Sequence, residues 1–282
     1  LAKEGKLPIV GTYGVFASAR NADQLRTSIC YGNLNVFVAG AHGGVSVGPD
    51  GATHQSLEEM YMVGGLPNMN LVVPCDAVET KKATEHLLFN VIGPKYLRFA
   101  REATPTISDA ATPFVFGRAN VIRFRGEKPK FAEAFEHKLS SNYINENEDI
   151  TIIACGPMVP EAMRAAWILK KEFGIETRII NMHTIKPLDK QAIEIAAKET
   201  GVILTAEEHQ KGGMGNKVAA VILESIRDYG HDCIMDMVGV DDRFGESGGS
   251  WELIKKFELC GEHIAAKARK IYDIKKKKYH GE

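Results

Sequence analysis

The feature that most constrains the fold is a strand-like run followed by a glycine-rich loop and the start of a helix, at residues 35–59. Residues 35–40 are apolar and lack a polar face, which is typical of a buried strand. Ser56 is followed three residues later by Glu59, a spacing that predicts a capping box at a helix N-terminus. Strand, glycine-rich loop and helix in this order form the ligand-binding unit of open α/β sheets.

The loop within this unit carries the side chains best suited to chemistry. Its glycines allow the backbone to approach a bound ligand closely. Its His42, Asp50 and His54 can hydrogen-bond a polar substrate and exchange protons with it. A purely structural interpretation stays open, because Pro-Asp-Gly is a common turn sequence and a single histidine is more often a bystander. Two histidines and an aspartate in one loop favour an active site.

Strand-like and helix-like segments alternate along the chain, which predicts an α/β fold of two domains, each a mainly parallel sheet flanked by helices. Residues 104–142 are less regular and contain several Pro and Gly breakers, so the domain boundary is expected there. The predicted domains are residues 1–117 and 143–282, joined by a linker at 118–142 that contains a short strand at 119–124. Helices are predicted at 20–31, 56–62, 76–90, 160–172, 187–199, 214–229, 251–258 and 263–272, and strands near 7–13, 35–40, 71–74, 96–100, 149–155, 176–181, 202–206 and 233–239.

Composition excludes some functions and leaves others open. The formal charge of -1 gives no reason to expect a nucleic-acid or membrane partner, and no apolar run reaches the length of a membrane span. The five cysteines are scattered and lack Cys-x-x-Cys spacing, so neither a disulfide framework nor a metal site is expected. We therefore expect a cytoplasmic protein in a reducing compartment.

Two charged segments outside the loop need an interpretation. Arg101 directly follows the strand predicted at 96–100, where α/β folds present ligand-binding groups, so it is a candidate functional residue. A solvated surface charge is the alternative for Arg101. The segment 207–215 contains clustered glycines, but it lacks the Lys-Ser/Thr ending of a P-loop and the G-x-G-x-x-G spacing. Nucleotide binding is therefore not predicted there.

The loop sequence His-Gly-Gly, five residues, then Asp-Gly-Ala-Thr-His-Gln resembles the signature of the transketolase family. The segments 73–79, 96–101 and 244–248 also look like landmarks of that family, so the resemblance covers most of the chain. Deoxyxylulose-phosphate synthases share the Asp-Gly-x-Thr-His-Gln part but usually lack a histidine matching His42. The E1 β subunits of 2-oxo-acid dehydrogenases typically have His-Ser-Gln in place of Thr-His-Gln. The resemblance implies a pyrimidine-binding domain followed by a transketolase C-terminal domain.

The resemblance also implies roles for individual residues. His54 matches the catalytic histidine that exchanges protons with substrate hydroxyls. Asp50 matches the residue that binds the hydroxyl next to the carbonyl, and His42 with Arg101 matches the pair that binds the sugar phosphate. Arg98 lies close to Arg101 in the sequence, and we favour Arg101 for this role. Tyr13 and Phe16 match the rings that stack on the aminopyrimidine of thiamine diphosphate, although Phe is usual at the first position and Ala19 replaces a third ring.

The chain has no Gly-Asp-Gly…Asn segment of the kind that binds diphosphate through Mg²⁺, so no metal ligand is predicted in it. We expect a split transketolase that transfers a two-carbon ketol unit between sugar phosphates. A separate N-terminal subunit would supply the diphosphate and magnesium site, and a heterotetramer is expected. The family's cofactor-activating Glu would precede Leu1, so we expect the pyrimidine-binding domain to begin before this sequence. Another thiamine diphosphate enzyme subunit, or a non-catalytic homologue, is the alternative.

Overall fold

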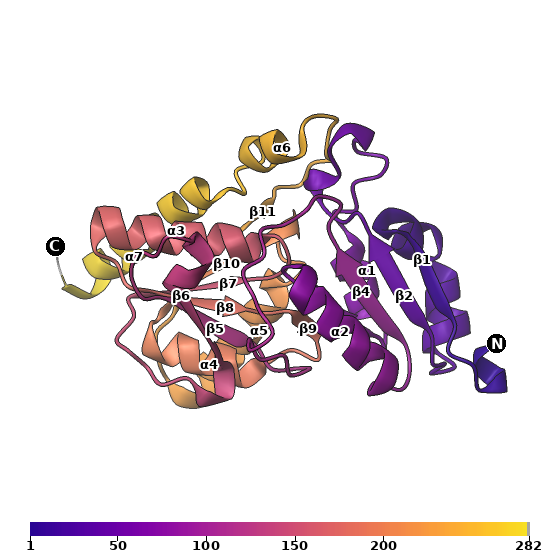
Figure 1. The fold of residues 1–282 in the computed structure, drawn as a ribbon. Coiled ribbons are helices and arrows are strands. Elements are labelled where there is room, and N and C mark those ends of the chain that lie inside the picture. The colour runs from indigo at the N-terminus through magenta and orange to yellow at the C-terminus, as the bar shows by residue number, and fades with distance from the viewer. Residues whose placement is uncertain (281–282) are drawn as a thin grey trace.

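The computed structural model describes residues 1–280 and contains two sheets with helices packed against them (Figure 1). In the first sheet the strand order is β1-β2-β4-β3-β9, and only β9 runs antiparallel to its neighbour. This arrangement confirms the predicted parallel α/β organisation of the first half of the chain. The strands are β1 Ile9–Tyr13, β2 Phe37–Ala41, β3 Asn70–Val72, β4 Lys95–Phe99 and β9 Thr184–Lys186.

The second sheet has the order β11-β10-β7-β8-β5-β6. Its first four strands are parallel, and β5 runs antiparallel to both of its neighbours, β8 and β6. All residues of β7 and β8 are buried, and the apolar run of β7 is typical of a strand covered on both faces. The strands are β5 Asn120–Phe124, β6 Phe135–Leu139, β7 Ile150–Ala154, β8 Thr177–Asn181, β10 Val202–Gln210 and β11 Ile234–Val240.

The segment 118–142, predicted as a linker with one short strand, contributes both β5 and β6 to the edge of the second sheet. The second half of the chain also contributes a strand to the first sheet, because β9 pairs with β3. Lys186 of β9 donates to the carbonyls of Gly64, at 3.4 Å, and Leu66, so it closes the C-terminal end of α1. One apolar cluster then joins the sheets, including Val38 and Leu71 from the first and Ile153 from the second.

Most helices lie close to their predicted positions, and α2 begins with an N-cap at Asp76, whose side chain accepts from the Glu79 amide at 2.8 Å. Among residues 1–280 no helix is long and apolar enough to cross a membrane. The helices are α1 Glu59–Gly65, α2 Ala77–Phe89, α3 Met158–Phe173, α4 Lys190–Glu199, α5 Gly215–Tyr229, α6 Ser250–Lys256 and α7 Gly261–His280.

Two predicted helix starts are wrong. The helix predicted at 20–31 is instead a pair of wider π-helical turns, Phe16–Arg20 and Gln24–Cys30. Within them, Ser18 and Thr27 donate their hydroxyls to carbonyls four residues earlier, each at 2.7 Å, and such bonds loosen regular α-helical pairing. The capping box at Ser56 also does not form, because α1 begins only at Glu59.

Candidate active site

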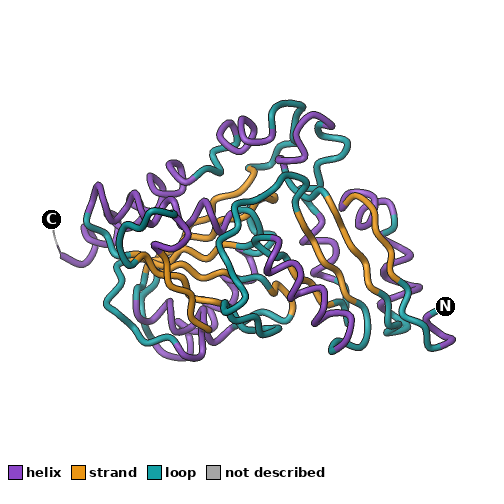
Figure 2. Tube along the Cα trace, in the orientation of Figure 1, coloured by secondary structure: helices purple, strands orange, loops and turns teal. Residues whose placement is uncertain are grey.

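The register of the first sheet brings the predicted site residues to one edge. Tyr13, the last residue of β1, pairs with Ala41 of β2, and Ala41 pairs with Phe99 of β4. His42 and Arg101 therefore leave neighbouring strands at the same carboxyl edge as Tyr13. Loops gather at this edge, and the loop after β2 reaches toward α6 (Figures 1 and 2). This is the position at which open parallel sheets bind ligands.

Four rings lie together at this edge. The ring centroids of Tyr13 and His42 are 4.2 Å apart, and those of Tyr13 and Phe16 are 5.7 Å apart. His54 presents its ring edge-on to both aromatic rings, at 5.4 Å from Tyr13 and 5.2 Å from Phe16. All four side chains are partly exposed. The arrangement is an open aromatic surface with two imidazoles on it.

The charged members of the site adjoin these rings. Asp50 accepts a hydrogen bond from the Tyr13 hydroxyl at 3.4 Å and lies 3.7 Å from the Arg101 guanidinium. Arg101 also donates to the Val47 carbonyl at 2.6 Å, and its side chain remains 33% exposed. Because the guanidinium has five N–H groups, most of its donors stay free for a ligand. We call Tyr13, Phe16, His42, Asp50, His54 and Arg101 the open cluster.

The two imidazoles of the open cluster differ in their surroundings. His54 has a single hydrogen-bond partner among the described residues, the Thr53 hydroxyl, 2.9 Å from its Nδ1. His42 has a left-handed backbone with φ of 61°, and its buried Nδ1 has no hydrogen-bond partner among residues 1–280. Burial lowers the pKa of His42, the Arg101 charge lowers it further, and Asp50 opposes both. At neutral pH His42 is therefore an uncharged imidazole.

A cation adjoins the aromatic surface next to Ala19. The guanidinium of Arg20 lies over the Phe16 ring, 4.3 Å from its centroid, in cation–π geometry. One face of the Phe16 ring is thus in contact with a charged side chain of this chain.

A second group of charged residues lies directly beneath the loop, where it is buried. Arg98 is 1% exposed and forms an ion pair with Glu59, whose carboxylate also accepts from the Tyr96 hydroxyl at 2.8 Å. Burial raises the pKa of Glu59, whereas the Arg98 charge opposes that rise. Arg98 is therefore a buried structural residue, and the preference for Arg101 at the ligand-binding edge agrees with the geometry.

The segment 207–209 completes this buried group from the second sheet. Glu207 accepts hydrogen bonds from the amides of Gly212, Met214 and Gly215, at 2.6–3.1 Å, so the glycine-rich loop encloses a carboxylate of its own chain. His209 accepts from the Met60 amide at 3.0 Å and so caps the first turn of α1 from the second domain. We call Glu59, Arg98, Glu207, Glu208 and His209 the buried cluster.

Sequence reasoning missed the contacts that join the loop to the second domain. Gln55 donates to the Val45 carbonyl at 3.0 Å and to the Glu246 carbonyl at 2.9 Å, and Ser250 donates to Glu102 at 2.9 Å. Gln55 and Glu246 both belong to segments singled out by the family resemblance. Their contact spans 191 residues, so no local pattern could reveal it.

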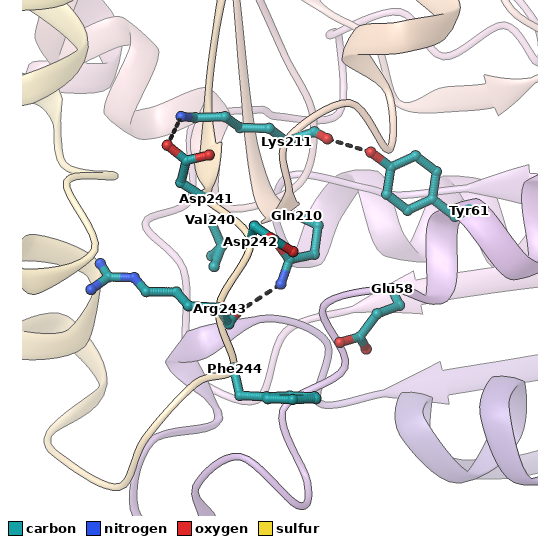
Figure 3. A pocket seen from close by; sticks show the side chains of 9 residues that line it. All are labelled: Glu58, Tyr61, Gln210, Lys211, Val240, Asp241, Asp242, Arg243 and Phe244. Atoms are coloured by element: carbon teal, nitrogen blue, oxygen red, sulfur yellow. Dashed lines mark hydrogen bonds and ion pairs between the residues drawn. The ribbon is translucent and has the colours of Figure 1, made fainter.

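A cavity of about 430 Å³ lies between α1 and the ends of β10 and β11, separate from the open cluster (Figure 3). Lys211 forms an ion pair with Asp241 at 2.5 Å and accepts at its carbonyl from the Tyr61 hydroxyl. Gln210 donates to the Arg243 carbonyl at 2.8 Å, and the Arg243 side chain extends away from Tyr61. These bonds fix the loop that leads from β11 toward residues 244–250.

The residues at the sheet edge suit proton exchange and anion binding rather than metal binding. Within residues 1–280, no group of three or more His, Cys, Asp or Glu side chains is arranged to hold a metal ion.

Comparison with known proteins assigns the family. Residues 1–106 match the transketolase pyrimidine-binding domain, and residues 140–264 match the transketolase C-terminal domain. A transketolase C-terminal section from Methanocaldococcus jannaschii is 35% identical over 94% of this chain and 75% of its own length. A 6-deoxy-6-sulfo-D-fructose transketolase subunit from Clostridium sp. is 32% identical over 98% of this chain and 77% of its own length.

Among solved structures, a split-gene transketolase described as an inactive β4 tetramer superposes with a TM-score of 0.77. It is 31% identical, and the match covers 96% of this chain and 78% of that one. The family resemblance noted from the loop signature is thereby confirmed over both domains. The chain belongs to the transketolase family, among its split, thiamine diphosphate-dependent members.

Proposed function

We propose that this chain is the C-terminal subunit of a transketolase that transfers a two-carbon ketol unit from a ketose phosphate to an aldose phosphate. The observation that carries the proposal is the open cluster, in which aromatic rings, imidazoles, a carboxylate and a guanidinium meet at one sheet edge. Proton exchange, hydroxyl recognition and anion binding are the tasks that this reaction requires of the protein.

The aromatic part of the open cluster fits thiamine diphosphate. Tyr13 and Phe16 present partly exposed rings beside one another, the type of surface on which an aminopyrimidine ring stacks. When bound, the cofactor supplies the carbon nucleophile and the electron sink for the ketose carbonyl. The contribution of this chain is to bind and orient, and to move protons at the substrate.

His54 is proposed as the catalytic residue of the chain. Its Nδ1 is engaged with the Thr53 hydroxyl, and its Nε2 has no hydrogen-bond partner among residues 1–280. An imidazole with one nitrogen fixed and the other available can accept or donate a proton at a substrate hydroxyl. Its edge-on packing against Phe16 keeps the ring next to the proposed cofactor position.

The other three polar residues are proposed to bind substrate. Asp50 would accept a hydrogen bond from the hydroxyl next to the carbonyl, and its contact with Tyr13 sets its orientation. Arg101 supplies the positive charge for the phosphate through its free N–H groups. His42, with its lowered pKa, would bind the same anion as a neutral donor. Such a pair suits a sulfonate as well as a phosphate, in keeping with the sulfo-sugar named for one relative.

A partner chain is part of the proposal. An N-terminal transketolase subunit would hold the diphosphate and its Mg²⁺, and two such pairs would form a heterotetramer. Support comes from the solved relative, whose β chains alone form an inactive tetramer. The cysteines, all of them free, suit a reducing cytoplasm as the location.

The direct test is to co-purify the chain with its N-terminal partner and measure thiamine- and Mg²⁺-dependent ketol transfer. His54→Ala is expected to lower kcat by about 10²- to 10⁴-fold, the range of a lost general acid–base group. His231→Ala is the matched control, because His231 hydrogen-bonds Ser225 and does not contact the open cluster. Unchanged activity of His54→Ala would refute the role given to His54.

The same assay separates the alternatives. Pyruvate consumption in place of ketose-plus-aldose exchange would identify a deoxyxylulose-phosphate synthase-like or E1 β-like subunit. An assembled pair that binds the cofactor but turns over neither type of substrate would identify a non-catalytic homologue.

A further inference from the structure

The start of the His42 loop rests on a carboxylate of the other domain. Glu208, near the end of β10, is 1% exposed, and its Oε1 accepts a hydrogen bond from the Ser46 amide at 2.5 Å. The two residues are 162 positions apart in the chain. A buried hydrogen bond of this kind fixes the backbone more firmly than a solvated one.

The two glycines after His42 pack directly on the buried cluster. A Cβ on Gly44 would lie 2.3 Å from Oε1 of Glu208, and a Cβ on Gly43 would lie 2.5 Å from Oε1 of Glu59. Gly44 also has a φ of 95°, which an L side chain rarely adopts. The backbone that follows His42 therefore has no freedom to shift toward the buried cluster, and its position depends on the carboxylates there.

The far end of the loop is joined to the same segment. Arg98 donates to the Glu208 carbonyl at 2.8 Å and approaches the Ser56 carbonyl at 3.5 Å. The backbone N–H of Gln210 donates to the Leu57 carbonyl at 2.8 Å. Residues 208–210 thus contact both the beginning and the end of the loop that carries His42, Asp50 and His54.

We propose that Glu208 is a positioning residue, which sets the anion-binding geometry of His42 by holding the loop backbone at Ser46. Glu208 touches neither the rings of the open cluster nor a substrate; it acts through the backbone of residues 43–46. The inference rests on the proposed function for its kinetic consequences, and it assigns a task in the active site to the C-terminal domain. A purely structural role for Glu208, as one more buried charge, is the competing explanation.

The kinetic test compares three variants in the complex with the N-terminal subunit. Glu208→Ala is expected to raise the KM for a phosphorylated aldose by about 10-fold or more, with a smaller change in kcat, since a small misplacement of a binding group is costly. Glu208→Gln retains an acceptor for the Ser46 amide, so its KM is expected to stay within about threefold of the wild-type value. Glu148→Ala is the matched control, because Glu148 is an equally buried, Arg178-paired carboxylate of the same domain, away from the loop.

A second measurement does not depend on turnover. In NMR titrations of the full chain, the pKa of His42 is expected to rise toward its ordinary value in Glu208→Ala, because a loosened loop hydrates the ring. Arg101 and Asp50, the charged groups that face His42, remain in every variant. Both Glu208→Gln and Glu148→Ala should leave the His42 titration as in the wild type.

The outcomes separate the two hypotheses. Equal KM changes in Glu208→Ala and Glu148→Ala, with an unshifted His42 titration, would overturn the positioning role and leave Glu208 structural. A wild-type complex without ketol transfer would refute the proposed function, whereas a shifted His42 titration in Glu208→Ala would still support positioning of the loop.

Discussion

Arg98 and Arg101 lie three residues apart near the end of one strand, but one side chain is buried and the other is partly exposed. Arg98 belongs to β4, is 1% exposed and pairs with Glu59 in the interior. Arg101 follows the strand, is 33% exposed at its side chain and lies 3.7 Å from Asp50. Arg98 lies within the strand, between the sheet and the buried carboxylates, whereas Arg101 lies in a bend beyond the strand's end. The comparison shows that residue type does not decide function here; the position of the residue relative to the strand's end does.

The histidines repeat the contrast. His54 and His42 are partly exposed members of the open cluster, and each has a ring nitrogen without a partner among residues 1–280. His209 is fully buried, and both its nitrogens are engaged, with the Met60 amide and the Gln210 carbonyl. The open cluster keeps ring nitrogens available for hydrogen bonds to a ligand. The side chains of the buried cluster instead hydrogen-bond the backbone of loops and of the first turns of helices.

The largest expected effect is on the free energy of unfolding when each of the two arginines is replaced by methionine. Arg98→Met is expected to lower the free energy of unfolding by about 3–5 kcal/mol, because Glu59 would remain as an unpaired buried carboxylate. Arg101→Met is expected to lower it by less than about 1 kcal/mol, since its ion pair with Asp50 is exposed to solvent. Urea unfolding of both variants measures the difference.

Substrate binding, unlike stability, should depend strongly on Arg101. In the complex with its partner, Arg101→Met is expected to raise the KM for a phosphorylated substrate by about 10- to 100-fold, the range for a lost hydrogen bond to a charged group. If Arg101→Met unfolded as readily as Arg98→Met, or bound phosphorylated substrate normally, the division into an open and a buried cluster would be wrong.

A smaller effect concerns the pH dependence of the buried cluster. Burial, aided by the Arg98 charge, lowers the pKa of His209 to about 3, below the 6.5 of an unfolded histidine. Between these values only the unfolded state binds the proton, so stability falls as the pH falls. Acidification from pH 6.5 to 5 is expected to cost about 2 kcal/mol through this residue. Denaturant unfolding at the two pH values measures the loss when the wild type is compared with a variant that lacks this imidazole.

His209→Gln is the variant that isolates this contribution, because a Gln side chain can still accept from the Met60 amide without titrating. Glu207 acts in the opposite direction: burial raises its pKa to about 7, so the native state binds its proton first and gains stability on acidification. The Glu207 contribution is present in both proteins and cancels in the comparison. Equal pH slopes for wild type and His209→Gln would show that His209 is not held neutral.

The sequence was sufficient for the parts of the molecule that depend on local pattern. The apolar run of β7 and the cap of α2 at Asp76 follow from residues within a few positions of one another. The residues of the open cluster were found because they leave the ends of adjacent parallel strands or share one loop, and the family resemblance named them. Their proximity required only the order of strands, which the α/β pattern implies.

The buried cluster could not be predicted in the same way. Its bonds join residues far apart in the chain, such as Ser46 to Glu208, and nothing in the neighbourhood of either residue encodes the other. β6 was missed because most of its residues are only partly buried, so it lacks the apolar run of a central strand. The capping box at Ser56 failed for a tertiary reason, since α1 begins only at Glu59 and the Glu59 carboxylate pairs with the buried Arg98.

The smallest expected effect tests which part of Tyr13 matters to the open cluster. The ring of Tyr13 contacts His42 at 4.2 Å, while its hydroxyl makes only a long 3.4 Å hydrogen bond to Asp50. Tyr13→Phe, which restores the residue usual in the family, is expected to change discrimination between epimeric substrate hydroxyls by about two- to threefold, the value of a weak hydrogen bond. The KM for thiamine diphosphate should not change, whereas Tyr13→Leu should raise it because the stacking surface is lost. A Tyr13→Phe variant with weakened cofactor binding would instead place the hydroxyl, rather than the ring, at the cofactor.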